Sequence, residues 1–323
     1  MKLIQLRRRI EYLIFRAFAC LIGVMNVRQT TWVADRLADV FVGVLPRKIS
    51  RYAVAEANLK HAFGQDLPEY EVQKLIHGMW SHLFRMVAEL VQSPRYMHLE
   101  NCRESIVFRD REQILRALGT GRPIIFLSGH FGNWEVSTTT FGMFGVPMGV
   151  IARALDNPYL HEWFKDYREA TGHQMILKKG GFDDLLDVIS RKGCVGLLAD
   201  QDAGQRGLFV DFFGQPASTF KSIALLAKEY DAMICVGYAR RLEDNFVDGR
   251  WSRYEVGVND VIDPREYNSM HEIREITQRY TLSLENAIRL APEQYFWVHR
   301  RWKSQPKAKK QTHVETTPLA NAA

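Results

Sequence analysis

The segment Gly129–Glu135, called the motif turn below, brings a histidine and a carboxylate into one short stretch of chain. It reads Gly-His-Phe-Gly-Asn-Trp-Glu and directly follows the apolar run 123–128. Such a run predicts a buried strand, and α/β sheets build their sites at the carboxyl ends of parallel strands. We expect Glu135 to lie in the first turn of the next helix and to reach back to His130. A carboxylate that holds one imidazole nitrogen lets the other nitrogen take a proton from an attacking hydroxyl.

No side chain of the protein stands out as a nucleophile for this pair. The sequence has no GxSxG elbow, and none of its cysteines occupies a comparable turn. The nucleophile is then expected to belong to the substrate, which predicts acyl transfer to a substrate hydroxyl or amine. The structural alternative is a histidine that caps a strand and a glutamate that is favoured at a helix N-terminus.

The remaining histidines and the cysteines do not form a recognisable metal site. His61, His77, His82 and His98 include no HExxH arrangement and no cysteine partner at zinc spacing, so we interpret them as surface or core residues. The four cysteines are scattered without a CxxC pair, which favours a reducing, cytoplasmic compartment. We therefore expect no metal and no organic cofactor.

The formal net charge of +6 is concentrated at the two ends of the chain, in Arg7–Arg9 and in the basic residues between 300 and 310. Clusters of this kind fit an anionic membrane surface, and for the C-terminal cluster the alternative is a solvated tail. Nucleic-acid binding is discounted, because the sequence has no recognisable module and no aromatic residues interleaved with the basic tail.

The chain divides into three expected parts: residues 1–48, residues 49–303 and residues 304–323. The first part holds an apolar stretch, 10–27, that contains Glu11 and Arg16 and is therefore a poor transmembrane span. A second, amphipathic stretch at 32–45 is expected to fold back on it, so that both form an anchor in or on the cytoplasmic leaflet. The alternative is a helical hairpin packed on the catalytic domain. The last part has the composition of a disordered tail.

The middle part alternates helical and strand-like patterns. Helical spacing runs from 50 to 91 with a break at 64–68, and returns at 158–171, 183–192 and 270–290. Short apolar runs predict buried strands at 123–128, 146–152, 193–199 and 233–238, and an edge-type strand at 253–258. This alternation predicts an α/β fold with a mostly parallel central sheet flanked by helices.

With these features in place, the sequence resembles the lipid A biosynthesis acyltransferases, also called lauroyl or myristoyl acyltransferases, of the lysophospholipid acyltransferase superfamily. The superfamily signature is a histidine and an acid separated by four residues, here His130 and Glu135. Further blocks match in order over nearly the whole chain: Gly132–Glu135, Arg153 with Asn157-Pro158, Asp200–Gly204, Gly207–Gly214 and Tyr295–Lys303.

The resemblance implies a glycerolipid acyltransferase-like fold and an enzyme on the cytoplasmic face of the inner membrane. It would move a fatty acyl chain from acyl carrier protein, or from acyl-CoA, to a hydroxyl of a membrane glycolipid of the lipid A precursor type. His130 would be the general base and Glu135 its orienting partner. Membrane lipids, the acyl donor and the glycolipid acceptor are the implied partners.

The same resemblance suggests which residues bind substrate. Arg153 would hold a phosphate or the polar head of the acceptor, with Asn157 supporting its loop. Asp200 and Gln201 would line the same pocket, and their alternative is a structural turn network. Phe209–Phe213 forms either a wall of the acyl-chain groove or a plain apolar β-segment.

Weaker expectations concern the cations near the C-terminal end. Arg300, Arg301 and Lys303 are candidates for contact with lipid phosphates or with an acidic carrier protein. Lys221 departs from the small residues that are common at its place in the family, which affects the expected donor or acceptor preference.

Two other functions stay open. The acceptor is alternatively a phosphatidylinositol mannoside, a lysophospholipid or an aminolipid. A non-catalytic lipid-binding protein is the third reading, and the presence of both His130 and Glu135 argues against it.

Overall fold

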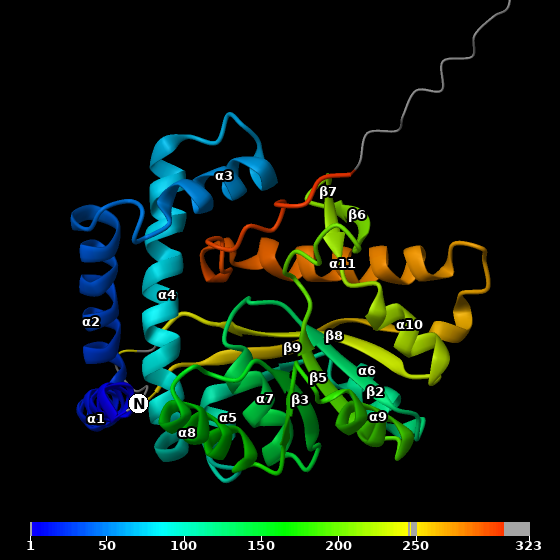
Figure 1. The fold of residues 1–323 in the computed structure, drawn as a ribbon, viewed down its shortest axis with the longest axis horizontal. Coiled ribbons are helices and arrows are strands. Elements are labelled where there is room, and N and C mark those ends of the chain that lie inside the picture. Colours follow the sequence, from blue (N-terminus) through cyan, green and yellow to red (C-terminus); the bar gives the residue numbers. More distant parts are fainter. Residues whose placement is uncertain (1, 245, 247–250, 307–323) are drawn as a thin grey trace, which may run out of the picture.

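A seven-stranded sheet forms the centre of the protein in its computed structural model, which describes residues 2–244, 246 and 251–306 (Figure 1). The strands lie in the order β1-β9-β8-β2-β5-β3-β4. Their bounds are β1 Ile106–Arg109, β2 Ile124–Ser128, β3 Met148–Ala152, β4 Gln174–Leu177, β5 Cys194–Leu198, β8 Met233–Arg241 and β9 Tyr254–Ile262. A separate antiparallel hairpin joins β6 Leu208–Phe212 to β7 Gln215–Thr219.

The sheet is mostly parallel, as the sequence predicts. Among its neighbouring strands only β8 and β9 run antiparallel. The edge position expected for 253–258 is wrong, because β9 lies between β1 and β8. Its alternating pattern has a different cause: Tyr254 and Val256 are buried in the core, while Glu255 between them accepts a hydrogen bond from the Tyr238 hydroxyl. The four-residue strands β1 and β4, which each hold three consecutive apolar residues, were not predicted from the sequence.

Helices cover both faces of the sheet. Ile125 and Leu127 of β2 pack with α10 (Ser222–Glu229) and α11 (Glu272–Leu290), whereas Ile124 and Phe126 pack on the other face with α6 (Arg111–Gly119) and α7 (Trp134–Met143). This alternation follows from the two-residue period of strand side chains. α8 (Pro158–Glu169) lies beside α7, and α9 (Phe182–Ser190) packs on β5. These helices match the predicted ranges 158–171, 183–192 and 270–290.

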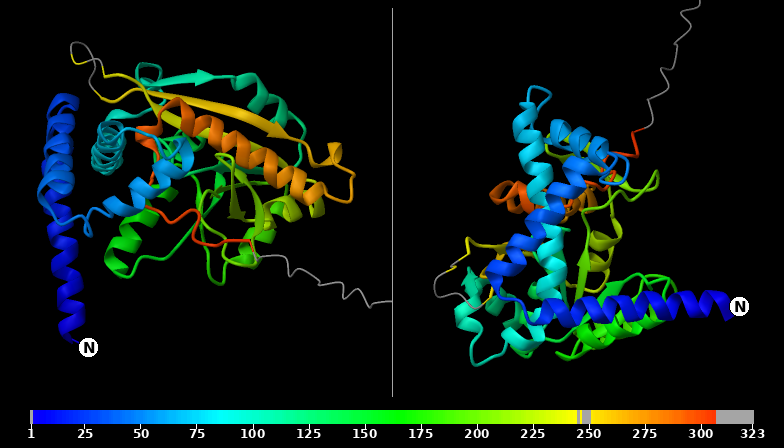
Figure 2. Two further views of the ribbon diagram at one scale, coloured as in Figure 1. Left: turned by 90° about the horizontal axis from the view of Figure 1, so that it is seen from above. Right: turned by 90° about the vertical axis from the view of Figure 1, so that its left-hand side faces the viewer.

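The N-terminal third of the chain is helical and stands to one side of the sheet (Figures 1 and 2). It comprises α1 (Lys2–Gly23), α2 (Val27–Asp39), a π-helical turn (Val40–Val44), α3 (Tyr52–Phe63) and α4 (Glu69–Tyr96). The predicted break at 64–68 is confirmed, because α3 ends before Gly64, which has a φ of 108°. Both α1 and α2 pack against α4. The expected packing of α2 on α1 is thus replaced by the packing of each helix on α4. None of the helices described is long and apolar enough to cross a membrane.

A third part of the core joins α3 and α4 to the segment that follows α11, residues 291–306, called the C-terminal segment below. Buried residues of both helices pack with Phe131 of the motif turn, with the hairpin β6–β7 and with Trp297. Two 3-10 turns flank α11, Pro264–Glu266 before it and Pro292–Gln294 after it, and the short helix α5 (Cys102–Ser105) precedes β1. Within the C-terminal segment, Ser304 is buried and hydrogen-bonded to Asp202. The rest of the predicted tail, from residue 307, lies outside the described residues.

Candidate active site

The motif turn connects β2 to α7 at the carboxyl edge of the sheet. The neighbouring strand β5 runs parallel to β2, and the N–H of Ala199 donates to the carbonyl oxygen of Ser128 at 2.9 Å. Two glycines allow this close packing. A Cβ on Gly129 would lie 3.3 Å from the Asp200 side chain, and one on Gly132, whose φ is +60°, would lie 2.1 Å from the carbonyl oxygen of Ala239. Each glycine thus leaves room that a side chain would fill.

Asp200, which follows β5, holds His130 through two hydrogen bonds. The backbone N–H of His130 donates to Oδ2 of Asp200 at 2.9 Å, and Nδ1 lies 2.8 Å from Oδ1. An ionised carboxylate only accepts hydrogen bonds, so Nδ1 carries the proton and Nε2 keeps a lone pair. The carboxylate is almost fully buried, whereas about one fifth of the His130 side chain is exposed. His130 can therefore meet a substrate through Nε2 while Asp200 stays shielded.

The electrostatics of the pair favour proton uptake by His130. Burial disfavours the imidazolium, but the charge and the hydrogen bond of Asp200 outweigh burial and raise the pKa of His130 above its ordinary value. Burial likewise disfavours the carboxylate, and the contacts with His130 outweigh that effect and lower the pKa of Asp200. A base stabilised in its protonated form is suited to take a proton from a hydroxyl during attack.

The free side of the imidazole faces an amide and two aromatic rings. Nε2 of Gln201 lies 3.4 Å from Nε2 of His130, so its amide donates to the lone pair. The rings of Trp134 and Phe296 have centroids 5.1 and 6.1 Å from that of His130. None of the hydrogen bonds of His130 within the described residues involves a hydroxyl or thiol of the protein. Asp200 and Gln201, which the sequence predicts to line one substrate pocket with Arg153, both contact the His130 imidazole.

Glu135, which the sequence analysis paired with His130, has a different partner. Its two carboxylate oxygens accept hydrogen bonds from Nη2 and Nε of Arg168, at 2.6 and 3.1 Å. Glu135 is buried in the first turn of α7, and Arg168 belongs to the last turn of α8. No hydrogen bond joins Glu135 to His130 among the described residues. The expected contact fails because the first turn of α7 directs Glu135 toward α8, while the neighbouring strand β5 supplies a closer carboxylate.

The two other predicted binding residues lie in the loop after β3. Arg153 is exposed and forms an exposed ion pair with Asp156 at 3.3 Å. Asn157 is buried, caps the N-terminus of α8 and donates to the carbonyl oxygen of Arg8 and to Glu11 of α1. The structure thus separates the two roles: Arg153 is available to a ligand, and Asn157 joins α8 to α1.

The remaining candidates are divided between surface and interior. Arg300, Lys303 and Lys221 are exposed. Arg301 is buried, and its guanidinium donates to the carbonyl oxygen of Ser218 and to the hydroxyl of Thr219. The expectation that Arg301 meets a ligand at the surface is therefore wrong, because it holds the hairpin β6–β7 from inside. Phe212 and Phe213 are buried in the core beneath that hairpin.

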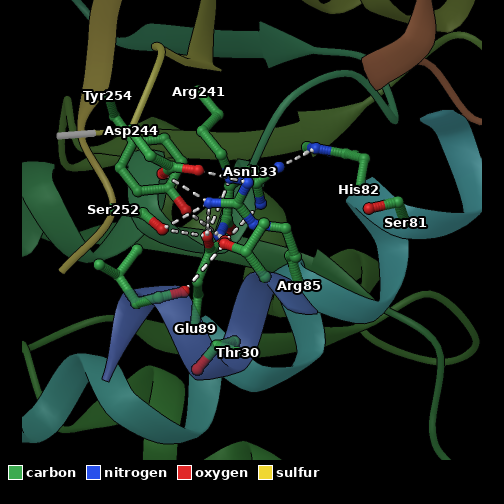
Figure 3. A network of polar contacts seen from close by, with 12 residues as sticks. Thr30, Ser81, His82, Arg85, Glu89, Asn133, Arg241, Asp244, Ser252 and Tyr254 are labelled. Atoms are coloured by element: carbon green, nitrogen blue, oxygen red, sulfur yellow. Dashed lines mark hydrogen bonds and ion pairs between the residues drawn. The ribbon is translucent and has the colours of Figure 1, made fainter. Parts of the chain in front are cut away.

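A buried network behind the motif turn was missed by the sequence analysis (Figure 3). Asn133 donates from Nδ2 to Glu89 at 3.1 Å and to the Tyr254 hydroxyl at 3.2 Å, while its Oδ1 accepts from the first turn of α7. The polar members come from α4, from the turn and from the β8–β9 hairpin: His82, Arg85, Glu89, Asn133, Arg241, Asp244, Ser252 and Tyr254. One signal was present in the sequence. His82, Arg85 and Glu89 are spaced by three and four, which places these three polar residues on one side of α4.

The C-terminal segment completes the support of the turn. The N–H of Phe296 donates to the carbonyl oxygen of His130 at 3.0 Å. The N–H of Gly132 donates to the carbonyl oxygen of Gln294, also at 3.0 Å. His299 follows, and its Nε2 accepts from the N–H of Asp202 at 3.3 Å. The turn is therefore enclosed by β5, β8 and the C-terminal segment.

The sequence matches a family model described as bacterial lipid A biosynthesis acyltransferase over residues 3–304. A lipid A biosynthesis acyltransferase of Haemophilus influenzae is 24% identical, with 86% of this chain and 85% of that protein covered. The lipid A biosynthesis lauroyltransferase of Escherichia coli is 27% identical, with 57% and 58% covered. A phosphatidylinositol mannoside acyltransferase of Mycobacterium tuberculosis is 27% identical, with 48% of each chain covered. Because the family model spans nearly the whole sequence, including the site around His130, the chain belongs to the bacterial lipid A biosynthesis acyltransferases.

Proposed function

We propose that this acyltransferase moves a fatty acyl chain from a thioester donor, acyl carrier protein or CoA, to a hydroxyl of a membrane glycolipid of the lipid A precursor type. The acceptor hydroxyl attacks the thioester carbonyl while Nε2 of His130 takes its proton. The thiol of the donor leaves and takes up a proton, and the new bond is an ester. The similarity to lipid A acyltransferases of Haemophilus influenzae and Escherichia coli supports this choice of acceptor.

The observation that carries the proposal is the geometry of the His130 imidazole. Its Nδ1 is held by a buried carboxylate, and its Nε2 carries a lone pair whose described partner is the Gln201 amide at 3.4 Å; about one fifth of the side chain is exposed. The described hydrogen bonds of His130 include no protein hydroxyl or thiol, so the atom that it activates is expected to come from the substrate. Asp200 takes the orienting role that the sequence analysis assigned to Glu135.

Arg153 is the proposed contact for an anionic group of the acceptor. It follows β3, which runs parallel to β5 and therefore ends at the same edge of the sheet as β2. Its side chain is about four fifths exposed, and its described partner, Asp156, is more exposed still. An exposed ion pair of this kind is weak, so a phosphate can replace Asp156 at little cost.

We propose further that the enzyme acts on the cytoplasmic face of the inner membrane, with α1 lying in the interface. The support is a surface of α1 that combines exposed apolar side chains with arginines. Leu3, Leu13 and Ile14 are each more than half exposed, and beside them Arg7 is exposed and Arg8 is partly exposed. Apolar residues next to cations on one helix favour binding to an anionic lipid surface.

A second acceptor class is favoured by one observation, the similarity to a phosphatidylinositol mannoside acyltransferase. Both acceptors are anionic glycolipids with free hydroxyls, so the same base serves either. Transfer of labelled acyl chains to purified lipid A precursor, to phosphatidylinositol mannoside and to a lysophospholipid, offered separately, distinguishes these acceptors. Acyl carrier protein and CoA thioesters are compared as donors in the same assay.

The first prediction tests the role of His130. We expect His130→Ala to lower acyl transfer by about 10²- to 10⁴-fold, since that is the usual contribution of a general base. His98→Ala serves as the matched control, because His98 is exposed and its ring contacts only a backbone carbonyl in its own helix end. Normal turnover by a folded His130→Ala enzyme would refute the proposed mechanism.

A further inference from the structure

His82 of α4 bridges a buried arginine and the main chain of the motif turn. Its Nε2 lies 3.0 Å from the carbonyl oxygen of Gly132, and its Nδ1 lies 2.5 Å from Nη1 of Arg241. A guanidinium has donors only, so Nδ1 must accept the hydrogen bond from Arg241. Nε2 therefore carries the proton and donates to Gly132. The contacts allow a single tautomer of His82.

The bridge stays neutral over the working pH range. Burial and the nearby charge of Arg241 lower the pKa of His82 to about 3. A second proton on the ring would remove the lone pair of Nδ1 that accepts from Arg241. It would also place a positive imidazolium beside the positive guanidinium. His82 is thus a permanent link between donor and acceptor, and it does not act as a pH switch.

Arg241 is in turn fixed by Glu89 (Figure 3). The Glu89 carboxylate is 1% exposed and accepts from Nε and Nη2 of Arg241, at 2.9 and 2.5 Å, and from Asn133 and Ser252. Removing two charges from water is costly, and well-packed apolar residues often stabilise a fold equally well. The charged pair of Glu89 and Arg241, with its hydrogen bonds satisfied, therefore indicates that the surrounding groups must be held in one defined arrangement.

The turn that these residues hold is two residues from His130. Gly132 packs directly against β8. Its α-carbon lies so close to the Ala239 carbonyl that no Cβ would fit between them. Asp200 follows a different strand, β5, so a shift of the turn changes the position of the His130 ring relative to its carboxylate partner. Displacements of about 1 Å can lower a catalytic rate roughly 100-fold.

We propose that His82 is a positioning residue of the acyl-transfer site: its bridge from Arg241 to the Gly132 carbonyl sets the His130 ring against Asp200. The proposal rests on the function proposed above for His130. It goes beyond that function by assigning a role to a histidine that touches neither His130 nor the open side of the site.

Three variants test the bridge. His82→Leu removes both hydrogen bonds, whereas His82→Gln retains them, because the glutamine carbonyl accepts from Arg241 and its amide donates to Gly132. His77→Leu is the matched control on the same helix: its ring contacts Asp39 of α2 and not the motif turn. We expect His82→Leu to lower kcat about 10- to 100-fold with KM within about twofold, and His82→Gln to recover most of the rate.

A proton NMR readout separates this proposal from the proposed function. The downfield Nδ1–H signal of His130, identified by its loss in His130→Gln, is expected to broaden or disappear in His82→Leu and to persist in His82→Gln and His77→Leu. A normal kcat for His82→Leu, or a glutamine variant as slow as the leucine variant, overturns the positioning role. If the wild-type protein transfers no acyl chain to any acceptor, the proposed function fails, while the NMR signal still decides whether His82 holds His130.

Discussion

His130 is held from several directions at once. Asp200 binds both its ring and its backbone N–H, and Phe296 binds its backbone carbonyl. The ring can therefore turn little, and the Nε2 lone pair keeps one direction, toward the side where Gln201 lies. In a general base this restriction matters as much as the pKa, because proton transfer requires a nearly linear hydrogen bond.

Replacing Asp200 by asparagine is expected to change both the rate and its pH dependence. His130 acts as a base only when neutral, so the rate rises with pH through its pKa, which Asp200 raises above 6.5. Without that charge the remaining effect is burial, which lowers the pKa of His130. We expect Asp200→Asn to shift the acidic limb of kcat/KM to lower pH and to reduce the plateau by about 10²- to 10⁴-fold. A pH–rate profile of both enzymes measures this.

Glu135→Gln provides the contrast within the same motif. Because Glu135 contacts Arg168 and not His130, the acidic limb of the kcat/KM–pH profile is expected to stay at the wild-type pH in Glu135→Gln. A limb that moves in Glu135→Gln and stays unchanged in Asp200→Asn would restore the pairing predicted from the sequence.

At the scale of elements, α8 connects the site to the N-terminal helix. Arg168 in its last turn binds Glu135 of α7, and Asn157 at its N-cap binds the backbone and a side chain of α1. Aromatic contacts between Phe15 of α1 and Trp163 of α8 strengthen the second link. Helix α8 thus contacts both α7, which carries Glu135, and α1, which we propose to lie in the membrane interface.

The ion pair between α7 and α8 is expected to contribute to stability more than to proton transfer. Arg168→Met leaves the buried Glu135 without a cation, so we expect the free energy of unfolding to fall by about 2 to 3 kcal/mol. The double variant Arg168→Met/Glu135→Gln removes the stranded charge and is expected to recover part of this loss. Chemical denaturation of both variants and of Glu135→Gln measures the coupling, and additive effects would contradict it.

At the scale of the whole molecule, α1 lies along one side of the protein and its N-terminal end extends beyond the remaining elements (Figure 2). Its buried contacts, such as Ile22 against the helical region, lie near its C-terminal end. Most of the side-chain surface of Leu3, Leu13 and Ile14 of α1 is exposed. The lipid surface that we propose as a partner of α1 fits both these residues and the neighbouring arginines.

Binding to anionic vesicles tests this orientation. Each arginine near such a surface contributes about 1 kcal/mol, so Arg7→Ser/Arg8→Ser is expected to weaken binding roughly 30-fold, with a smaller effect at high salt. Arg111→Ser/Arg116→Ser changes the charge equally at an exposed place on α6 and is the control. Vesicle sedimentation at several salt concentrations measures both variants, and equal losses would argue against α1 as the binding surface.

The sequence alone determined the class of fold, most of its helices and strands, and the place of His130. Apolar runs and helical spacing are local properties that burial imposes along the chain, so they can be read without the tertiary structure. The position of a histidine after a buried strand is local in the same sense. The inclusion of Asp200 and Gln201 in the pocket followed from the resemblance to a family, not from spacing.

Only the tertiary structure decided which carboxylate meets His130, because the choice depends on strand order. Asp200 is 70 residues away in the chain, yet parallel pairing of β2 and β5 brings it to the imidazole, while the nearer Glu135 turns with α7 toward Arg168. The same reasoning applies to His82 and Arg241, which the packing of α4 on the β8–β9 hairpin brings together behind the motif turn. Spacing in the sequence predicts contacts within one element, whereas hydrogen bonds between elements follow from how these pack.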